Sequence, residues 1–440
     1  MTELKKELTL FGLTMIAVGS CIGSGIFITP AEIAGYLNNG HLILLVWLVG
    51  GVISLTGALT FAELGGLFQD AGGVFIYLRA AYGRLVAFLY GWVILTVVTS
   101  GALAALSVAL ARFLQFIWPF PDQWRTMVGV TVLAVLTIVN ILGVKMGEWV
   151  SNVFTSLKLL GMLIIVAIAI GMGTQHPFTE ASFTDATGQF GFSAFGGALI
   201  GVLWSYGGWY HASFLAGEAK NPQRNVPRAM VFGALIVTAM YVLTNLAYLY
   251  LMPVSRMATS SAIAADAVES VLQIGGILVA LIIVISIFGT ISIYTLSAPR
   301  VYFAMAKSNV FFPGLAYVHP RYQTPARAIL LQSGWSVVLV LFWQTFEDLI
   351  AYVVFMDWIF MILGAISVFI FRKTMADAYR PYRTTWYPVT PIVFITISTW
   401  FVGNMLIEKP VQALFGAGLV LLGLPVYFVF NRRQPLNVQA

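Results

Sequence analysis

Two short glycine-containing segments offer main-chain hydrogen-bonding groups within otherwise apolar stretches. Residues 23–27 read Gly-Ser-Gly-Ile-Phe, and residues 205–209 read Ser-Tyr-Gly-Gly-Trp. Each predicts a helix interruption, which leaves N–H and C=O groups without intrahelical partners. In lipid such groups are tolerated only where protein, water or a ligand supplies partners. The two segments are therefore the first candidates for a binding site.

The polarity of the interrupted helices indicates the ligand. A helix that restarts after Gly23 presents N–H groups and the positive end of its dipole, which suit a carboxylate, and Ser24 and Gly25 add donors without bulk. The preceding half-helix should end near Cys21 and Ile22, and the second half-helix near Trp204 and Ser205, exposing carbonyls that suit an ammonium group. An α-amino acid carries both groups a few Å apart.

Lys158 is a cation well inside an apolar segment, roughly 12 Å from its cytoplasmic end. A central lysine costs about 2.5–3.5 kcal/mol on insertion scales, so it should face the protein interior. One alternative is that its side chain snorkels to the interface. The other is a fixed ammonium near the breaks, acting where sodium acts in ion-coupled transporters or carrying a transported proton.

Several other polar residues lie in apolar segments. Four of them form a polar stripe at near i, i+4 spacing: Ser286, Thr290, Tyr294 and Ser297. Such a stripe either joins helices or lines a site. Asp357 is an intramembrane acid, which is a site candidate unless Lys158 or water partners it. His211 is interpreted as a hydrogen-bonded core residue, whereas Glu63 and Glu218 should fix loops or form gate salt links.

The composition identifies a polytopic membrane protein. Of 440 residues, 60% are hydrophobic and 9% charged, against about 25% charged in soluble domains. The net charge of +6 does not suggest nucleic acid, because the basic residues are scattered among loops. The single cysteine, Cys21, excludes an internal disulfide. The start has no cleavable signal pattern. No metal-ligand cluster or catalytic constellation is recognised, so neither a cofactor nor an enzyme activity is expected.

The apolar segments predict an all-α protein with twelve spans of about 20 residues each. We place them near 10–35, 41–64, 83–117, 126–143, 150–171, 192–215, 229–252, 270–305, 327–344, 348–371, 386–407 and 411–430.

The basic residues set the expected orientation. Of 23 lysines and arginines, Lys158 lies within a span, and only Arg112, Arg125, Arg256 and Lys409 fall on the outer side when both termini are cytoplasmic. The other eighteen then lie inside, a clear positive-inside bias.

The two breaks lie at repeat-related places. Gly23 is in span one and Gly207 in span six, and these spans run in opposite directions. Two five-helix repeats of inverted topology, each beginning with a broken helix, are typical of transporters whose substrate site lies near mid-membrane. The alternative is that the glycines serve helix packing, since Gly19 and Gly23 form a GxxxG pair.

The chain resembles the amino acid–polyamine–organocation superfamily, and the L-type amino acid transporters in particular, over nearly its whole length. The resemblance is carried by residues 22–27 with Pro30, by 154–160 around Lys158, by 206–209 followed by 217–222 and 224–227, and by Arg300 with 304–313 and 319–320. It implies a LeuT-like fold in one transmembrane domain over residues 1–440. Repeat one would cover about 10–171, repeat two about 192–371, and two peripheral helices about 386–430.

The same resemblance implies site roles. Ser24 and Gly25 would bind the substrate carboxylate, carbonyls of Cys21, Trp204 and Gly207 its ammonium, and Trp204 would act as an aromatic gate. Tyr210 and Asp357 would line the side-chain pocket, and Lys158 matches the lysine of sodium-independent members. The expected substrate site comprises Cys21, Ile22, Gly23, Ser24, Gly25, Ile26, Trp204, Ser205, Gly207, Tyr210 and Asp357, with Trp204, Lys158, Ser286 and Thr290 in gating or coupling.

Two departures from the L-type pattern stand out. Asp357 replaces a frequent neutral asparagine, which leaves neutral and cationic substrates both open. The segment 118–125 lacks the cysteine that attaches a glycoprotein subunit in animal members, so a prokaryotic chain without a disulfide-linked partner is expected.

The expected function is secondary transport of amino acids across the cytoplasmic (inner) membrane by alternating access, in contact with lipid. Sodium-independent exchange is favoured, and proton-coupled symport through Lys158 is the alternative. A membrane sensor that binds amino acids without translocating them is a rival from another class, although both termini are short.

Overall fold

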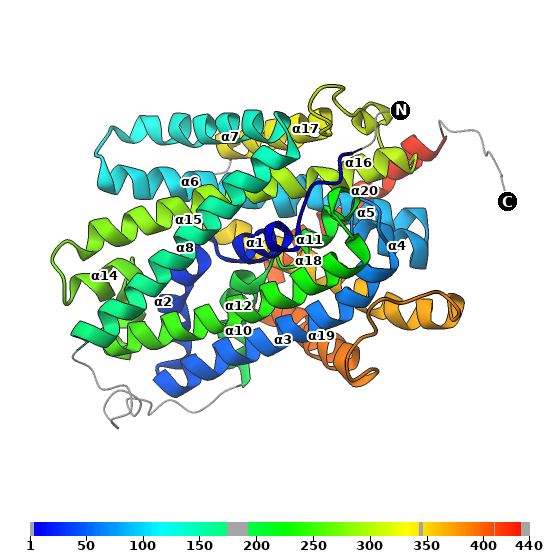
Figure 1. The fold of residues 1–440 in the computed structure, drawn as a ribbon. Coiled ribbons are helices and arrows are strands. Elements are labelled where there is room, and N and C mark those ends of the chain that lie inside the picture. Colours follow the sequence, from blue (N-terminus) through cyan, green and yellow to red (C-terminus); the bar gives the residue numbers. More distant parts are fainter. Residues whose placement is uncertain (1–3, 174–191, 343–345, 409, 433–440) are drawn as a thin grey trace.

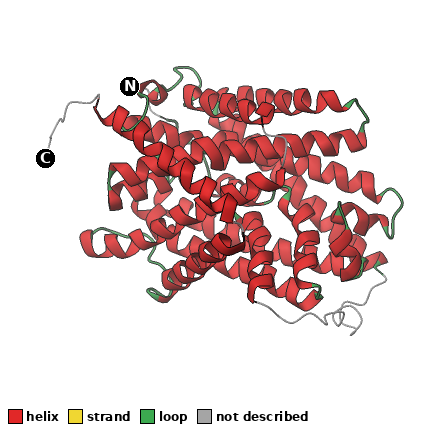
Figure 2. Cartoon of the chain, turned by 180° about the vertical axis from the view of Figure 1, so that it is seen from behind, coloured by secondary structure: helices red, strands yellow, loops and turns green. Residues whose placement is uncertain are grey.

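The computed structural model describes residues 4–173, 192–342, 346–408 and 410–432. This part of the chain is helical, with no strand, as Figure 2 shows. One isolated parallel bridge joins Leu8 to Ala219. Residues 174–191, between the fifth and sixth predicted spans, lie outside the described residues.

The first half of the described chain is built from eight α-helices and a π-helical turn. They are α1 (Leu10–Cys21), α2 (Gly25–Leu37), α3 (Gly40–Leu67), α4 (Val74–Tyr82), α5 (Arg84–Val93), η1 (Ile94–Val98), α6 (Thr99–Ile117), α7 (Arg125–Ile141) and α8 (Val144–Met172). The second half contains α10 (Phe192–Tyr206), α11 (His211–Phe214), α12 (Pro222–Leu251), α13 (Val254–Thr259), α14 (Ile263–Glu269), α15 (Gly275–Ser297), α16 (Pro299–Lys307), α17 (Ala326–Phe342), α18 (Phe346–Thr374), α19 (Val389–Glu408) and α20 (Pro410–Arg432).

Within the described residues, ten helical segments are long and apolar enough to cross a membrane, by length and composition. They match ten of the twelve predicted spans. The other two predicted spans, at 192–215 and 327–344, correspond to the shorter helices α10 and α17, of 15 and 17 residues. The short helices α4, α13 and α14 were not predicted, because each has fewer than ten residues and lies between the long apolar runs.

The interrupted helices lie in the centre of the bundle. Helix α1 packs against α8, α12 and α15 and also contacts α11, as Figure 1 shows. Helices α19 and α20 pack against α3, α18 and α5. The first described residues and the end of α20 lie at the same end of the bundle (Figure 1).

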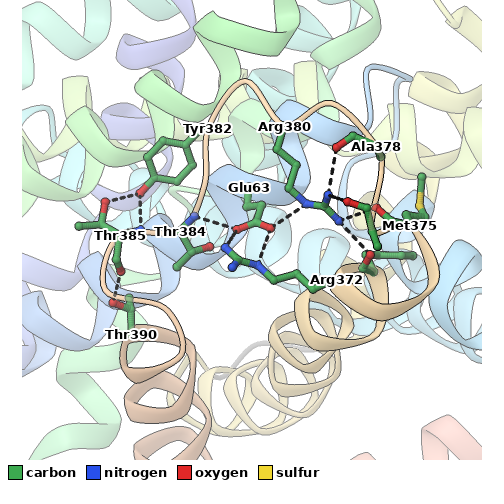
Figure 3. A network of polar contacts seen from close by, with 11 residues as sticks. Glu63, Arg372, Met375, Ala378, Arg380, Tyr382, Thr384, Thr385 and Thr390 are labelled. Carbon is green, nitrogen blue, oxygen red and sulfur yellow. Dashed lines mark hydrogen bonds and ion pairs between the residues drawn. The ribbon is translucent and has the colours of Figure 1, made fainter.

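Glu63, near the C-terminal end of α3, links three segments. Its carboxylate accepts two hydrogen bonds from Arg372, at 3.0 and 2.7 Å, one from Arg380 at 3.1 Å and one from the backbone N–H of Thr384 at 2.8 Å (Figure 3). The network links α3 to the end of α18 and to the connection that follows it. This confirms the prediction that Glu63 fixes a loop.

Glu218 forms the corresponding link beside α11. Its two carboxylate oxygens accept hydrogen bonds from Arg300 at 2.7 and 2.8 Å, and both side chains are fully buried. Arg300 belongs to α16, so the pair connects the segment that follows the second break to the end of the α15–α16 span. The predicted salt link of Glu218 is therefore present.

Candidate functional site

Both predicted interruptions are present. Helix α1 ends at Cys21 and α2 begins at Gly25, while α10 ends at Tyr206, one to two residues later than expected, and four turn residues separate it from α11. The N-terminus of α2 has no side-chain cap, because Ser24 at the N-cap position makes no capping bond. The first N–H groups of α2 are thus without intrahelical partners.

The two breaks are in direct contact. The hydroxyl of Ser20 donates to the Gly208 carbonyl at 2.7 Å. The Tyr241 hydroxyl, from α12, lies 2.8 Å from the carbonyl oxygens of both Cys21 and Ser205. A Cβ at Gly25 would stand 2.5 Å from the Ser205 hydroxyl. Segments 180 residues apart therefore meet backbone to backbone.

The glycines of the breaks have different roles. A side chain at Gly19 would collide with Thr155 and Ile293, so Gly19 serves close helix packing. At Gly23 the nearest atoms to an added Cβ are 3.7 Å away, so packing does not require this glycine. Gly208 has φ of +125°, and its added Cβ would lie 2.8 Å from the Ser20 backbone. Packing explains Gly19, whereas backbone conformation and close approach require Gly208.

The carbonyl end of α1 is occupied by Lys158. Its ammonium donates to the carbonyls of Gly19 at 3.0 Å and Ile22 at 2.6 Å, and to the Thr290 hydroxyl at 2.9 Å. The side chain is fully buried, so it does not snorkel to the interface. The Ser286 hydroxyl lies 3.2 and 3.0 Å from the carbonyls of Ile22 and Gly23. Lysine, serine and threonine together satisfy the end of the half-helix.

Two adjoining cavities lie at the breaks. The break cavity is lined by Cys21, Gly23, Ser24, Gly25, Ser205 and Thr290, among others. The Asp357 cavity is lined by Thr99, Leu203, Tyr210, His211, Asp357 and Trp358, among others. Ala102, Trp204, Gly207 and Tyr294 line both cavities, so the two share a wall.

The polar groups of the break cavity are only partly used. The Ser24 hydroxyl is buried and, among the residues that the structure describes, has no hydrogen-bond partner. The Cys21 carbonyl accepts a hydrogen bond from the Gly23 N–H and lies 2.8 Å from the Tyr241 hydroxyl, whose single proton it shares with the Ser205 carbonyl. The Trp204 carbonyl accepts one hydrogen bond, from the Gly207 N–H at 3.1 Å.

Asp357 is held by Tyr210. The Tyr210 hydroxyl donates to one Asp357 carboxylate oxygen at 2.6 Å. Lys158 is not its partner in the described structure, since the lysine is bonded to the end of α1. His211 lies in the same cavity, hydrogen-bonded to Ser297 at 2.6 Å and stacked on Tyr294, as expected for a core histidine.

Most predicted site residues come together at these cavities. Two predicted substrate-binding residues do not line either cavity: Ile22 contributes its carbonyl to Lys158, and Ile26 is fully buried with its carbonyl 3.3 Å from the Tyr248 hydroxyl. Of the predicted gating or coupling residues, Lys158 and Ser286 also lie outside both linings and contact the carbonyls of the first break. Tyr241, Ala102 and Trp358 were not predicted. Only Trp358 had a signal in the sequence, namely its place beside Asp357.

The comparisons with known proteins agree with this architecture. The family model described as amino acid permease matches residues 8–428. The chain is 34% identical to the serine/threonine exchanger SteT of Bacillus subtilis, covering 98% of each chain. It is 30% identical to the human b(0,+)-type amino acid transporter 1, over 98% of this chain and 88% of that one. It is 28% identical to the human cystine/glutamate transporter, over 97% of this chain and 86% of that one.

These relatives are transporters and not enzymes, and the long apolar helices agree with a multi-pass membrane protein. The chain belongs to the amino acid permease family, within the amino acid–polyamine–organocation superfamily.

Proposed function

We propose that the protein exchanges amino acids across the cytoplasmic membrane by alternating access, without sodium. The observation that carries this proposal is the meeting of two interrupted helices at a cavity with a buried, unpartnered serine hydroxyl. The membership of the chain in a family of amino acid transporters, including a serine/threonine exchanger, supports both the substrate class and exchange.

The substrate head group is assigned to the break cavity. The Ser24 hydroxyl and the first N–H groups of α2 bind the carboxylate, favoured by the positive end of the helix dipole. The ammonium is assigned to the carbonyl end of α10, at Trp204 and Gly207, because the Cys21 carbonyl already accepts the Gly23 N–H and shares the Tyr241 hydroxyl with Ser205. Trp204 lines both cavities and acts as the gate.

Lys158 supports sodium independence. Its ammonium supplies a positive charge at the carbonyl end of α1, the kind of oxygen cluster that otherwise attracts a metal cation. A neutral amine has two N–H donors for the three acceptors that Lys158 now contacts. Release of its proton would remove one donor and the positive charge, and among the described residues only the Thr290 and Ser286 hydroxyls could replace that donor at these oxygens. This favours exchange with a fixed charge over proton coupling.

The membrane arrangement completes the proposal. We assign twelve spans, with inverted repeats over about 10–171 and 192–371, peripheral helices over about 386–430, and both termini in the cytoplasm. The position of both described ends at one end of the bundle supports this assignment (Figure 1). No disulfide-linked subunit is proposed.

The test is counterflow into proteoliposomes that are preloaded with unlabelled amino acid. Labelled amino acid should enter preloaded vesicles without any ion gradient, and replacing sodium by choline should not change the rate. Lys158→Ala should lose at least about 90% of the rate, since it leaves buried acceptors unpaired. Lys145→Ala, an exposed lysine on the same helix, is the control.

Other outcomes would decide against the proposal. Net accumulation that requires a proton gradient would favour symport, and wild-type rates in Lys158→Ala would remove the role of the lysine. Amino acid binding without uptake would favour a sensor.

A further inference from the structure

The Asp357 carboxylate is a buried group with unused hydrogen-bonding capacity. The residue is 8% exposed and lines the Asp357 cavity. One oxygen accepts the Tyr210 hydroxyl, and the other has no partner among the described residues. Acids in membrane-spanning helices are rare, and they pair with another group or mark a substrate pathway.

No protein cation balances this carboxylate within the described structure. The lining of the Asp357 cavity contains neither lysine nor arginine among the described residues; its ionisable side chains besides Asp357 are Tyr210, His211 and Tyr294. His211 is engaged by Ser297 and by the Tyr294 ring. The Lys158 ammonium is hydrogen-bonded to the Gly19 and Ile22 carbonyls at the first break. A buried carboxylate without a protein counter-ion is best satisfied by a cation that comes with the ligand.

The walls of the cavity also suit an organic cation. Trp204, Trp358, Tyr210 and Tyr294 contribute aromatic side chains to the lining. The faces of such rings attract ammonium and guanidinium groups, tryptophan most strongly. A carboxylate among aromatic walls recognises the charge while the walls cover the alkyl stem.

The shared wall of the two cavities places the side chain of a ligand relative to its head group. A head group bound at Ser24 and Gly25 lies in the break cavity, and a side chain that passes Trp204 and Gly207 enters the Asp357 cavity. We propose that basic α-amino acids are preferred substrates of this protein, with the side-chain cation bound at the free oxygen of Asp357. This inference rests on the proposed function.

The experiment compares two amino acids that differ in one terminal group. L-Lysine carries an ammonium where L-2-aminoheptanoate carries a methyl group, on side chains of equal length. Half-saturation constants for exchange of each are measured in proteoliposomes that contain the full-length protein. The wild type should prefer lysine by roughly tenfold or more, because the analogue leaves Asp357 unpaired.

Variants assign that preference to Asp357. The half-saturation constant for the analogue divided by that for lysine should fall toward one in Asp357→Asn, whatever the effect of the substitution on the absolute rates. Asp122→Asn is the matched control: its carboxylate is 78% exposed, on the connection between α6 and α7, and the ratio should stay at the wild-type value.

Each remaining outcome overturns the inference in a distinguishable way. Exchange of the analogue but not of lysine refutes the basic substrate class while leaving the proposed function intact. A wild-type preference that persists in Asp357→Asn refutes the assigned residue. Exchange of neither compound, nor of any common amino acid, refutes the proposed function as well.

A second measurement, on the wild type alone, tests the inference even if Asp357→Asn does not fold. The melting temperature of the purified wild-type protein should rise more with lysine than with equal concentrations of the analogue. Equal shifts, or a larger shift with the analogue, would contradict the inference.

Discussion

The ammonium nitrogen of Lys158 lies 2.6 Å from the carbonyl oxygen of Ile22, the first residue after α1 ends. A helix that ends inside a membrane leaves carbonyls that need donors. Here a side chain from α8 supplies them, so the interruption persists without a ligand at that end. On the other side of the break, the Ser24 hydroxyl has no hydrogen-bond partner among the described residues, and α2 begins without a side-chain cap.

Thr290→Val should remove hydrogen bonds that stabilise the interruption after α1. The Thr290 hydroxyl lies within hydrogen-bonding distance of Lys158 and of the Gly19 and Ile22 carbonyls, and valine keeps the shape without the hydroxyl. Losing a buried hydrogen bond costs about 1–3 kcal/mol, so exchange should slow roughly tenfold. Thr295→Val, whose hydroxyl bonds only within its own helix, is the control. Equal rates in both variants would contradict the role of Thr290.

Ser24→Ala should raise the half-saturation constant of exchange. A hydrogen bond to a carboxylate contributes about 1.5–3 kcal/mol, which corresponds to roughly a ten- to hundredfold rise. The melting temperature without substrate should not change, because the hydroxyl has no protein partner in the described structure. Ser54→Ala removes another buried, unpartnered serine hydroxyl, on α3 and outside both cavities, and should leave the constant unchanged.

Gly208→Ala should destabilise the protein and abolish exchange. An alanine at φ of +125° is strained, and its Cβ would lie 2.8 Å from the Ser20 backbone. The free energy of unfolding should fall by about 1–3 kcal/mol, which is measured as a lower melting temperature. Gly35→Ala on α2 meets no atom within 4 Å and should not lower it. A Gly208→Ala protein with wild-type stability and rate would show that the breaks do not need this close approach.

Tyr241→Phe should loosen the contact between the two breaks. The hydroxyl reaches the Cys21 and Ser205 carbonyls, one from each break, at 2.8 Å. Its loss should cost about 1–3 kcal/mol of stability. Tyr248→Phe, two turns along the same helix, removes one longer bond of 3.3 Å and should cost less. A lower melting temperature for Tyr248→Phe than for Tyr241→Phe would argue against Tyr241 as the link between the two breaks.

Removing one charge of the Glu218–Arg300 pair should destabilise the protein more than replacing both residues by apolar ones. Both side chains are fully buried, so Glu218→Gln leaves Arg300 without its counter-charge at a cost of about 3–5 kcal/mol. The double variant Glu218→Leu, Arg300→Met should recover part of that loss. Thermal unfolding of the single and double variants provides the comparison, and a double variant less stable than the single one would refute the interpretation.

The sequence predicted the breaks because glycines, a serine and apolar flanks are local signals. It also predicted that Lys158 faces the interior, since a mid-membrane cation has few other choices. Periodicity placed Ser286 and Thr290 on one face of a helix, and the structure shows that this face of α15 meets the first break. These features follow from the composition of single segments.

The remaining site features depend on contacts between distant segments. Tyr241 lies in an apolar helix with nothing local to mark its hydroxyl as the link between the breaks. The partner of Asp357 is Tyr210 and not Lys158, because Lys158 is taken up by the end of α1. The contact of Tyr241 with the Cys21 carbonyl likewise depends on α12 lying beside α1.

An experimental structure with bound substrate would show whether the two interruptions form the amino acid site. The ligand should be the amino acid that raises the melting temperature most. We expect its carboxylate within hydrogen-bonding distance of Ser24 and the start of α2, and its ammonium at the carbonyl end of α10. A ligand bound elsewhere, or a continuous helix through residues 22–24, would show that the two interruptions do not form the site.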